Sequence, residues 1–363
     1  MTARPTRLHA EPVRDWAALG REWEALEAEA PGAPFFRGWG WVGCLAEERF
    51  PRPLLLRAEE GGRTLGLALF NRDGPRLMLA ESGDPARDAP FVEHNGPLLA
   101  EGAPAGLAAA MLRAAWHTSG ARRLVLGGVT PGLAAEVGGT ARRHQARPAP
   151  YVDLAAVRAA GGDWLATLSA NARQQLRRSD RLFAGEAGEV AAREAATPGE
   201  AADFLAEMME LHARRWGGEG AYRSEWLRRF HRELAARALG RGEMELLRVT
   251  GAGGALVGLL QNFRRGGVVS AYQSGWAEPA GEGGRAKPGL TCHHAAIRRA
   301  LTRGDAEYDF LAGDQRYKRS LSGAERELVW AERVRAWSAE GLVLRGAKRL
   351  QRFFVKSLRS QQP

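Results

Sequence analysis

Cysteine is scarce in this chain of 363 residues, which contains only Cys44 and Cys292. The two thiols lie far apart in the sequence and lack the ligand spacing of a zinc site, and a single pair makes no disulfide framework. We therefore expect no metal cofactor. Sparse cysteine also fits a protein of the reducing cytoplasm.

Long apolar runs are missing as well. The longest, such as residues 65–70 and 256–260, are far shorter than the roughly 20 residues that cross a membrane as a helix. Arg4 and Arg7 are followed by no apolar stretch, so the N-terminus does not read as a secretory signal. With 45% hydrophobic and 26% charged residues, the composition is that of a folded soluble protein. We expect a cytoplasmic location, or a peripheral one at the inner membrane face.

Lysine is rare, because only four of the 52 basic residues are lysines although the net charge is +10. Arginine and lysine are not interchangeable where a compact point charge is needed. The few lysines are therefore candidates for specific roles. Two of them, Lys287 and Lys318, lie in the stretch 268–320.

The stretch 341–363 is a basic tail that contains no acidic residue. Its six basic residues are Arg345, Lys348, Arg349, Arg352, Lys356 and Arg359. Its apolar residues share one side of a predicted helix, at Leu350, Phe353, Phe354 and Leu358. This pattern is typical of contact with a membrane surface or a polyanion, and equally of a terminal helix that packs on its own protein.

The order of predicted elements repeats in the two halves of the chain. Each half reads as helix, helix, three antiparallel strands, helix and strand, because apolar residues recur at helical or alternating spacing and glycine pairs mark turns. The three strands are predicted at residues 53–59, 63–70 and 76–80, and again at 243–250, 255–265 and 268–276. We predict two similar α+β domains, residues 1–150 and 151–340, followed by the tail 341–363.

The stretch 268–320 carries most candidate functional residues. After its first strand, a glycine-rich loop (277–288) leads into a helix (289–302), a second strand (307–311) and a second loop (312–320). Lys287, Pro288 and Gly289 precede the helix, whose free N–H groups could hold a phosphate together with the lysine. The alternative is an ordinary helix start with proline at its first position and a solvated lysine.

Five segments of the second half carry a resemblance to a known family. They are residues 169–178 (SANARQQLRR), 212–216 (HARRW), 272–275 (YQSG), 287–290 (KPGL) and 308–318 (YDFLAGDQRYK). In this order they resemble the GNAT acyltransferases, in the tandem FemAB-like branch and in particular the CelD/BcsL group. The resemblance implies two GNAT domains with mixed central sheets flanked by helices. It also implies transfer of an acyl group, such as acetyl, to an amine or hydroxyl.

The resemblance leaves the donor and the acceptor open. GNAT enzymes use acyl-CoA as co-substrate, Fem enzymes use aminoacyl-tRNA, and the CelD group is linked to envelope polysaccharides. The expected acceptor is a small molecule or a glycan, and nucleic acid is a partner only if tRNA is the donor. A non-catalytic scaffold that binds polysaccharide or membrane is the alternative outside enzymology.

The resemblance implies a transfer centre in the loop 312–320. Tyr317 and Lys318 match the aromatic–lysine pair of Fem-type enzymes, and such a lysine can stabilise the oxyanion of a tetrahedral intermediate. Asp314 in this loop and Asp309 on the strand before it are candidates for a general base or a substrate contact. The alternatives are a solvated lysine, a core tyrosine and carboxylates bonded to the backbone.

Further residues are expected to contact donor or acceptor. They are Gln273, Ser274, Lys287, Pro288, Gly289, Arg173, Arg177, His212 and Trp216. The first five would border the donor, where GNAT sheets splay. The two arginines belong to a basic helical stripe, which suits a nucleotide, a tRNA or an anionic polymer but is also common on solvated faces. His212 and Trp216 would contact the acceptor or close the core.

Overall fold

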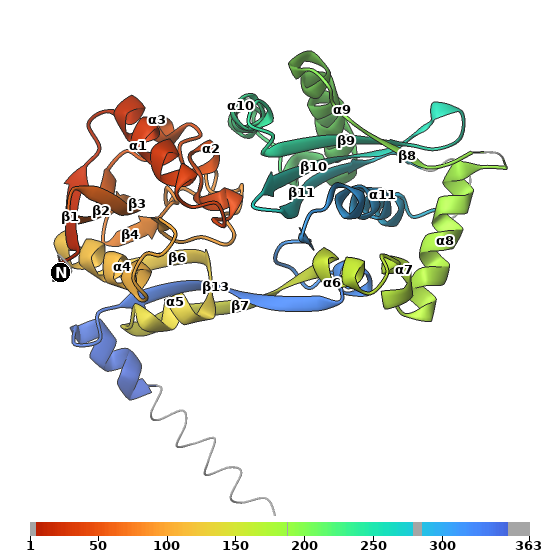
Figure 1. The fold of residues 1–363 in the computed structure, drawn as a ribbon. Helices are drawn as coiled ribbons and strands as arrows, with labels where there is room; N and C mark the ends of the chain where they lie inside the picture. The colour runs from red at the N-terminus through yellow and green to blue at the C-terminus, as the bar shows by residue number, and fades with distance from the viewer. Residues whose placement is uncertain (1–4, 187, 279–284, 348–363) are drawn as a thin grey trace, which may run out of the picture. The chain divides into compact units, whose positions relative to one another are not determined.

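The structure is a computed structural model, and it describes residues 5–186, 188–278 and 285–347. The chain divides into two compact units. Unit 1 comprises residues 1–30, 46–146 and 328–363, and unit 2 comprises residues 31–45 and 147–327. Both contain a β-sheet with helices (Figure 1), which confirms the predicted α+β class.

Unit 1 is built on a mixed sheet. Its strands lie in the order β1 (Arg7–Pro12), β2 (Pro53–Glu60), β3 (Arg63–Asp73), β4 (Arg76–Leu79), β6 (Arg123–Val129) and β13 (Ala324–Val334), with β5 (Leu98–Leu99) paired to β3. Only β4 and β6 run parallel among these pairs. The helices of this unit are α1 (Trp16–Ala28), α3 (Ala46–Arg49), α4 (Leu107–Thr118) and α5 (Pro131–Glu136). The β2–β3 turn uses Gly61 and Gly62, whose φ angles of 61° and 87° suit glycine.

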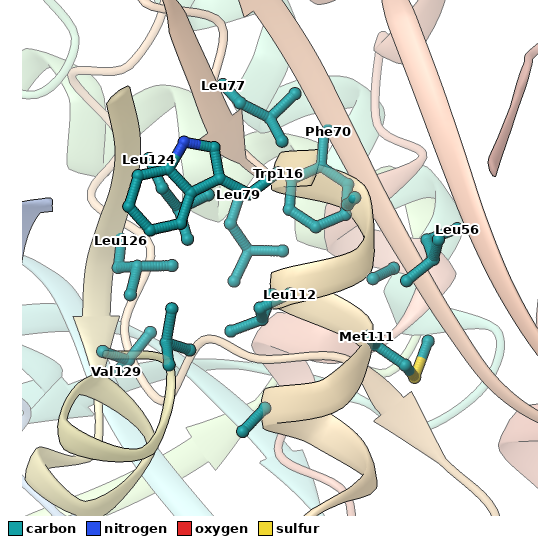
Figure 2. Close-up of a cluster of buried hydrophobic side chains, with 14 of the residues drawn as sticks. Leu56, Phe70, Leu77, Leu79, Met111, Leu112, Trp116, Leu124, Leu126 and Val129 are labelled. Carbon is teal, nitrogen blue, oxygen red and sulfur yellow. The ribbon is translucent and has the colours of Figure 1, made fainter. Parts of the chain in front are cut away.

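The core of unit 1 forms where α4 covers the sheet. Met111, Leu112 and Trp116 of α4 point toward leucines and a phenylalanine of the strands (Figure 2), and all are almost fully buried. The Trp116 indole also donates a hydrogen bond to the carbonyl of Ala121 (3.1 Å), which satisfies its one polar atom. Burial of this apolar face holds the helix to the sheet.

Unit 2 repeats the plan. Its strands lie in the order β7 (Thr140–Asp153), β12 (Glu307–Asp309), β11 (Val268–Trp276), β10 (Leu256–Arg265), β9 (Met244–Thr250) and β8 (Ala191–Glu194). Again one pair, β11 and β12, is parallel. The helices are α2 (Trp39–Val42), α6 (Leu154–Ala159), α7 (Trp164–Thr167), α8 (Ala170–Ala184), α9 (Pro198–Trp216), α10 (Glu225–Leu239), α11 (Pro288–Arg303) and α12 (Arg316–Leu321). Short 3₁₀ turns lie at η1 (Phe35–Arg37), η2 (Gly217–Glu219) and η3 (Ala252–Gly254).

Helices α9 and α11 lie on opposite faces of this sheet. A side chain at Gly275 of β11 would lie 3.0 Å from Leu211 of α9, whereas one at Gly258 of β10 would lie 3.1 Å from Cys292 of α11. The start of α9 follows local rules, since Thr197 caps it and the Glu200 carboxylate accepts from the N–H of Ala196 (2.6 Å).

The division of the chain differs from the predicted ranges 1–150 and 151–340 at residues 31–45, 147–150 and 328–340. Residues 31–45 belong to unit 2, because Phe35 stacks on Phe263 with ring centroids 4.1 Å apart and Trp41 contacts Tyr272. Residues 328–340 belong to unit 1, because β13 pairs with β6. The predicted loop 312–320 is wrong in part, since α12 begins within it. The apolar tail residues from Leu350 onward lie outside the described residues.

Candidate functional site

An opening between β11 and β12 defines the site. The parallel ladder has three residue pairs, from Val268 with Glu307 to Ser270 with Asp309, and β11 then continues to Trp276. The chain after β12 turns toward β7 instead, where Phe310 and Gly313 donate backbone hydrogen bonds (3.0 and 2.8 Å). The two strands therefore separate beyond Ser270.

The edge of β11 that borders this opening contains Gln273 and Ser274, whose contact with a donor stays a prediction. Both are half-buried. Gly275 faces α9, and strand residues alternate, so Ser274 and Trp276 lie on the α11 face. The Trp276 ring meets the His293 ring of α11 edge-on at 5.9 Å. A residue bulged at Tyr272 shifts the register beside this edge.

The N-terminus of α11 is fixed by α8. The Ser179 hydroxyl, fully buried, accepts from the N–H of Lys287 (2.9 Å) and lies 2.9 Å from the Thr291 hydroxyl. The Lys287 ammonium donates to Gln175 Oε1 (2.9 Å). Pro288 and Gly289 open the helix, which has no side-chain cap at Lys287. The helix end predicted to hold a phosphate is thus locked in place by a serine that the sequence interpretation did not single out.

We expect Ser179→Ala to destabilise the protein by about 2 kcal/mol, because a buried hydroxyl with several partners is lost and the partners stay buried. Denaturant unfolding measures the change. Ser322→Ala is the matched control, since the Ser322 hydroxyl makes one longer bond (3.4 Å) at the surface. An equal effect of both substitutions would contradict this role of Ser179.

A buried histidine lies at the centre of the site. His293 is 4% exposed, its Nδ1 lies 2.9 Å from the Tyr308 hydroxyl, and its ring stacks on Tyr317 at 5.5 Å and 17°. Burial, and then the charge of Lys318, lower the pKa of His293 to about 3. The imidazole is therefore neutral at physiological pH. Tyr317 keeps 39% of its surface exposed, and burial of the remainder raises its pKa to about 12.

Lys318 follows Tyr317 in α12, directly after the loop that leaves β12. It is 7% exposed, and its ammonium donates to the carbonyls of Leu311 (3.1 Å) and Ala312 (2.9 Å). Leu311 has a φ of 61°, which is unusual for leucine, and a side chain at Gly313 would lie 3.1 Å from the ammonium. The solvated alternative for this lysine is thus wrong, and the charge holds the loop in its conformation.

The two predicted carboxylates lie in different environments. Asp309 is 1% exposed, and its carboxylate accepts a hydrogen bond from the N–H of Leu311 (2.7 Å). This bond matches the alternative in which the carboxylate is bonded to the backbone. Asp314 is exposed at the surface of the same loop. A base role for Asp314 stays a prediction.

The end of α9 contributes the next group. His212 is buried, and its ring lies 6.2 Å from Trp216, which is 56% exposed. The Arg215 guanidinium lies over the Trp216 ring at 5.6 Å. Its charge opposes the rise in the pKa of Tyr317. Trp216 and Arg215 together make an exposed aromatic and basic surface at the end of α9.

The two predicted arginines of α8 lie elsewhere. Arg173 donates to the carbonyl of Ala166 (3.2 Å), and Arg177 is exposed. Two hollows of about 460 and 210 Å³ lie along α11 near α8 and β8 and share Arg298 in their lining. Neither is lined by Tyr317 or Lys318. Within the described residues, no three metal-binding side chains cluster and no helix is long and apolar enough to cross a membrane.

Sequence interpretation assigned no role to Ser179, Tyr308 or His293. A small polar residue in a basic helix and a tyrosine in an apolar strand are common, so neither carries a signal of its own. The pairing of His293 with Tyr317 joins two elements far apart in sequence, which periodicity does not report.

Comparison with known proteins identifies the second half. Residues 170–319 match the family model described as an acetyltransferase (GNAT) domain. These residues are therefore similar in sequence to a GNAT domain. The GNAT fold predicted for the chain is thereby confirmed, and the repeated strand plan of unit 1 makes the arrangement a tandem one. The finer assignment to the CelD/BcsL group stays a prediction.

Solved structures of similar fold cover both units. One is FemX, at 10% identity and a TM-score of 0.57, which covers 89% of this chain and 97% of that one. A second is the C-terminal domain of a putative lysylphosphatidylglycerol synthetase from Agrobacterium fabrum. Its identity is 12% and its TM-score 0.55, and the match covers 92% of this chain and 96% of that one. L-PGS from Bacillus licheniformis is a third, with an identity of 14% and a TM-score of 0.54, and the match covers 91% of this chain and 96% of that one. At these identities the likeness shows the fold alone. No curated protein matches the sequence.

Proposed function

We propose that this chain transfers an acyl group from acyl-CoA to an amine or hydroxyl, and that the reaction takes place at the opening between β11 and β12. The observation that carries the proposal is the parallel strand pair that separates after three residues within a GNAT domain. The opening is bordered by Ser274 and Trp276 on one side. His293 contacts Trp276, and Tyr317 stacks against His293.

The chemistry would follow from these side chains. The acceptor attacks the thioester carbonyl, a C–N or C–O bond forms, the C–S bond breaks, and the thiolate takes a proton. Tyr317 suits that last step, because its raised pKa keeps the phenol protonated and it is partly exposed. Lys318 places a positive charge beneath the loop, and Asp314 is the candidate for the base that takes the acceptor's proton.

A second candidate function uses aminoacyl-tRNA as donor. It is favoured by Arg177, Arg178 and Arg181, which are exposed on α8 and form no ion pair with any described carboxylate. Such a surface attracts a polyanion. For either donor, an envelope glycan or its precursor is the acceptor we propose, and the basic tail would bring the protein to the membrane surface.

Titration with acetyl-CoA tests the proposed donor. We expect binding in calorimetry, and we expect Ser274→Phe to weaken it at least tenfold, because the ring would occupy the opening. Thr302→Phe on the exposed side of α11 is the control and should bind as the unchanged protein does. Deacylation of charged tRNA without acetyl-CoA binding would favour the second candidate. If the protein uses neither acetyl-CoA nor charged tRNA, the result would favour the non-catalytic scaffold.

A further inference from the structure

Unit 1 contains the same kind of parallel strand pair as unit 2. The ladder between β4 and β6 also has three residue pairs, from Arg76 with Arg123 to Met78 with Val125. β6 then continues to Val129, whereas β4 ends at Leu79. The place that corresponds to the candidate site of unit 2 is therefore the gap between Leu79 and the end of β6.

Unit 1 fills this gap with its own chain. Asn95 bridges the two strands, because its N–H donates to the carbonyl of Gly128 on β6 (2.9 Å) and its side-chain amide donates to the carbonyl of Leu79 (3.0 Å). Asn95 is 1% exposed and Val92 is 2% exposed. The bridge is thus an interior feature rather than a surface contact.

The two glycines of β6 show how tightly the gap is filled. Gly128 has a φ of 63°, and a side chain there would lie 2.4 Å from the carbonyl oxygen of Val92. A side chain at Gly127 would lie 2.6 Å from the carboxylate of Glu81. Burial, and then the charge of Asp88, raise the pKa of Glu81 to about 8, so this group enters the gap mostly uncharged. No room remains beside β6 for a second occupant at these positions.

The lengths of the connecting segments explain the difference. Residues 80–106 connect β4 to α4 in unit 1, but only residues 277–287 connect β11 to α11 in unit 2. The longer segment can cross the gap and return. The shorter one must span from Trp276 to Lys287, which Ser179 fixes at the start of α11.

We infer that the chain binds one acyl thioester, in unit 2 alone, because residues 92–95 of unit 1 occupy the place that the donor takes in unit 2. The inference rests on the proposed function for its ligand. Unit 1 is then a GNAT-like copy that its own loop has closed to donors. One donor site per chain is the consequence.

Calorimetry with acetyl-CoA measures the number of sites. We expect one site per chain, and we expect Ser274→Phe in unit 2 to remove the whole signal. Two sites, or a signal that survives Ser274→Phe and disappears in a variant of unit 1, would overturn the inference. Absence of any binding would reject the proposed donor instead.

Hydrogen exchange tests the filled gap without any donor. We expect slow exchange at residues 92–96, and at least tenfold faster exchange there in Asn95→Ala, which loses the bond to Leu79. Phe91→Ala is the matched control, since Phe91 lies on the same loop and is 60% exposed. With acetyl-CoA bound, added protection should appear at residues 271–276 and not at 92–96. Fast exchange of 92–96 in the unchanged protein would overturn the inference.

Discussion

Lys318→Met is expected to destabilise unit 2 by about 3 kcal/mol and to abolish acyl transfer, because two charge-assisted hydrogen bonds are lost and two loop carbonyls stay buried. The carbonyls are those of Leu311 and Ala312, and the first belongs to a residue with positive φ. Without the ammonium, these two carbonyls lose a charged donor, so we expect Tyr317 also to lose its position on His293.

Denaturant unfolding and an assay of acyl transfer measure the two parts of this effect. Arg319→Met is the control, because Arg319 follows Lys318 directly and its side chain is 57% exposed. A Lys318→Met protein of unchanged stability that still loses transfer at least a hundredfold would assign Lys318 to the reacting oxyanion alone. Unchanged stability with unchanged transfer would reject both roles.

Unit 2 is expected to lose stability steeply as the pH falls from about 6.5 toward 3. His231 is fully buried, and neither of its ring nitrogens has a hydrogen-bond partner among the described residues. Burial, and then the charge of His212, lower the pKa of His231 to about 3, and the pKa of His293 is lowered to the same value. Because the folded-state pKa lies below the unfolded one, the stabilisation is complete above the unfolded pKa and disappears as protons bind the unfolded chain. A pKa difference of one between the two states corresponds to about 1.4 kcal/mol, so two such imidazoles cost several kcal/mol in acid.

Unfolding followed from pH 8 to pH 4 tests this dependence. His231→Phe should flatten the acid slope, since the surrounding rings of Tyr222 and Tyr272 suit an aromatic side chain. His144→Phe is the control, because His144 is exposed. Glu81 in unit 1 gives the opposite pH dependence, because its pKa is raised in the folded state. The stability that Glu81 contributes is complete below its unfolded-state pKa and is lost as the pH rises through about 8. An acid slope that His231→Phe leaves unchanged would contradict the assignment.

Local pattern predicted the elements near the site well. Thr197 and Pro198 start a helix as their sequence indicates, and β2, β3, β9, β10 and β11 lie close to the ranges that the sequence predicts. Phe35, Phe36 and Trp41 form core of unit 2. The predicted strand at 307–311 is present as the shorter β12, but local pattern failed at α12, because a six-residue helix is too short to show a period.

The sequence by itself determined the repeated α+β plan, the position of the acyltransferase-like segment and the pairing of Tyr317 with Lys318, because these depend on neighbours along the chain. Only the tertiary structure decided that Lys318 is buried against loop carbonyls, that His293 supports Tyr317, and that Asn95 closes the gap in unit 1. Each of these contacts depends on which strands pair and where they separate. Strand pairing joins residues far apart in the chain, so no local spacing contains that information.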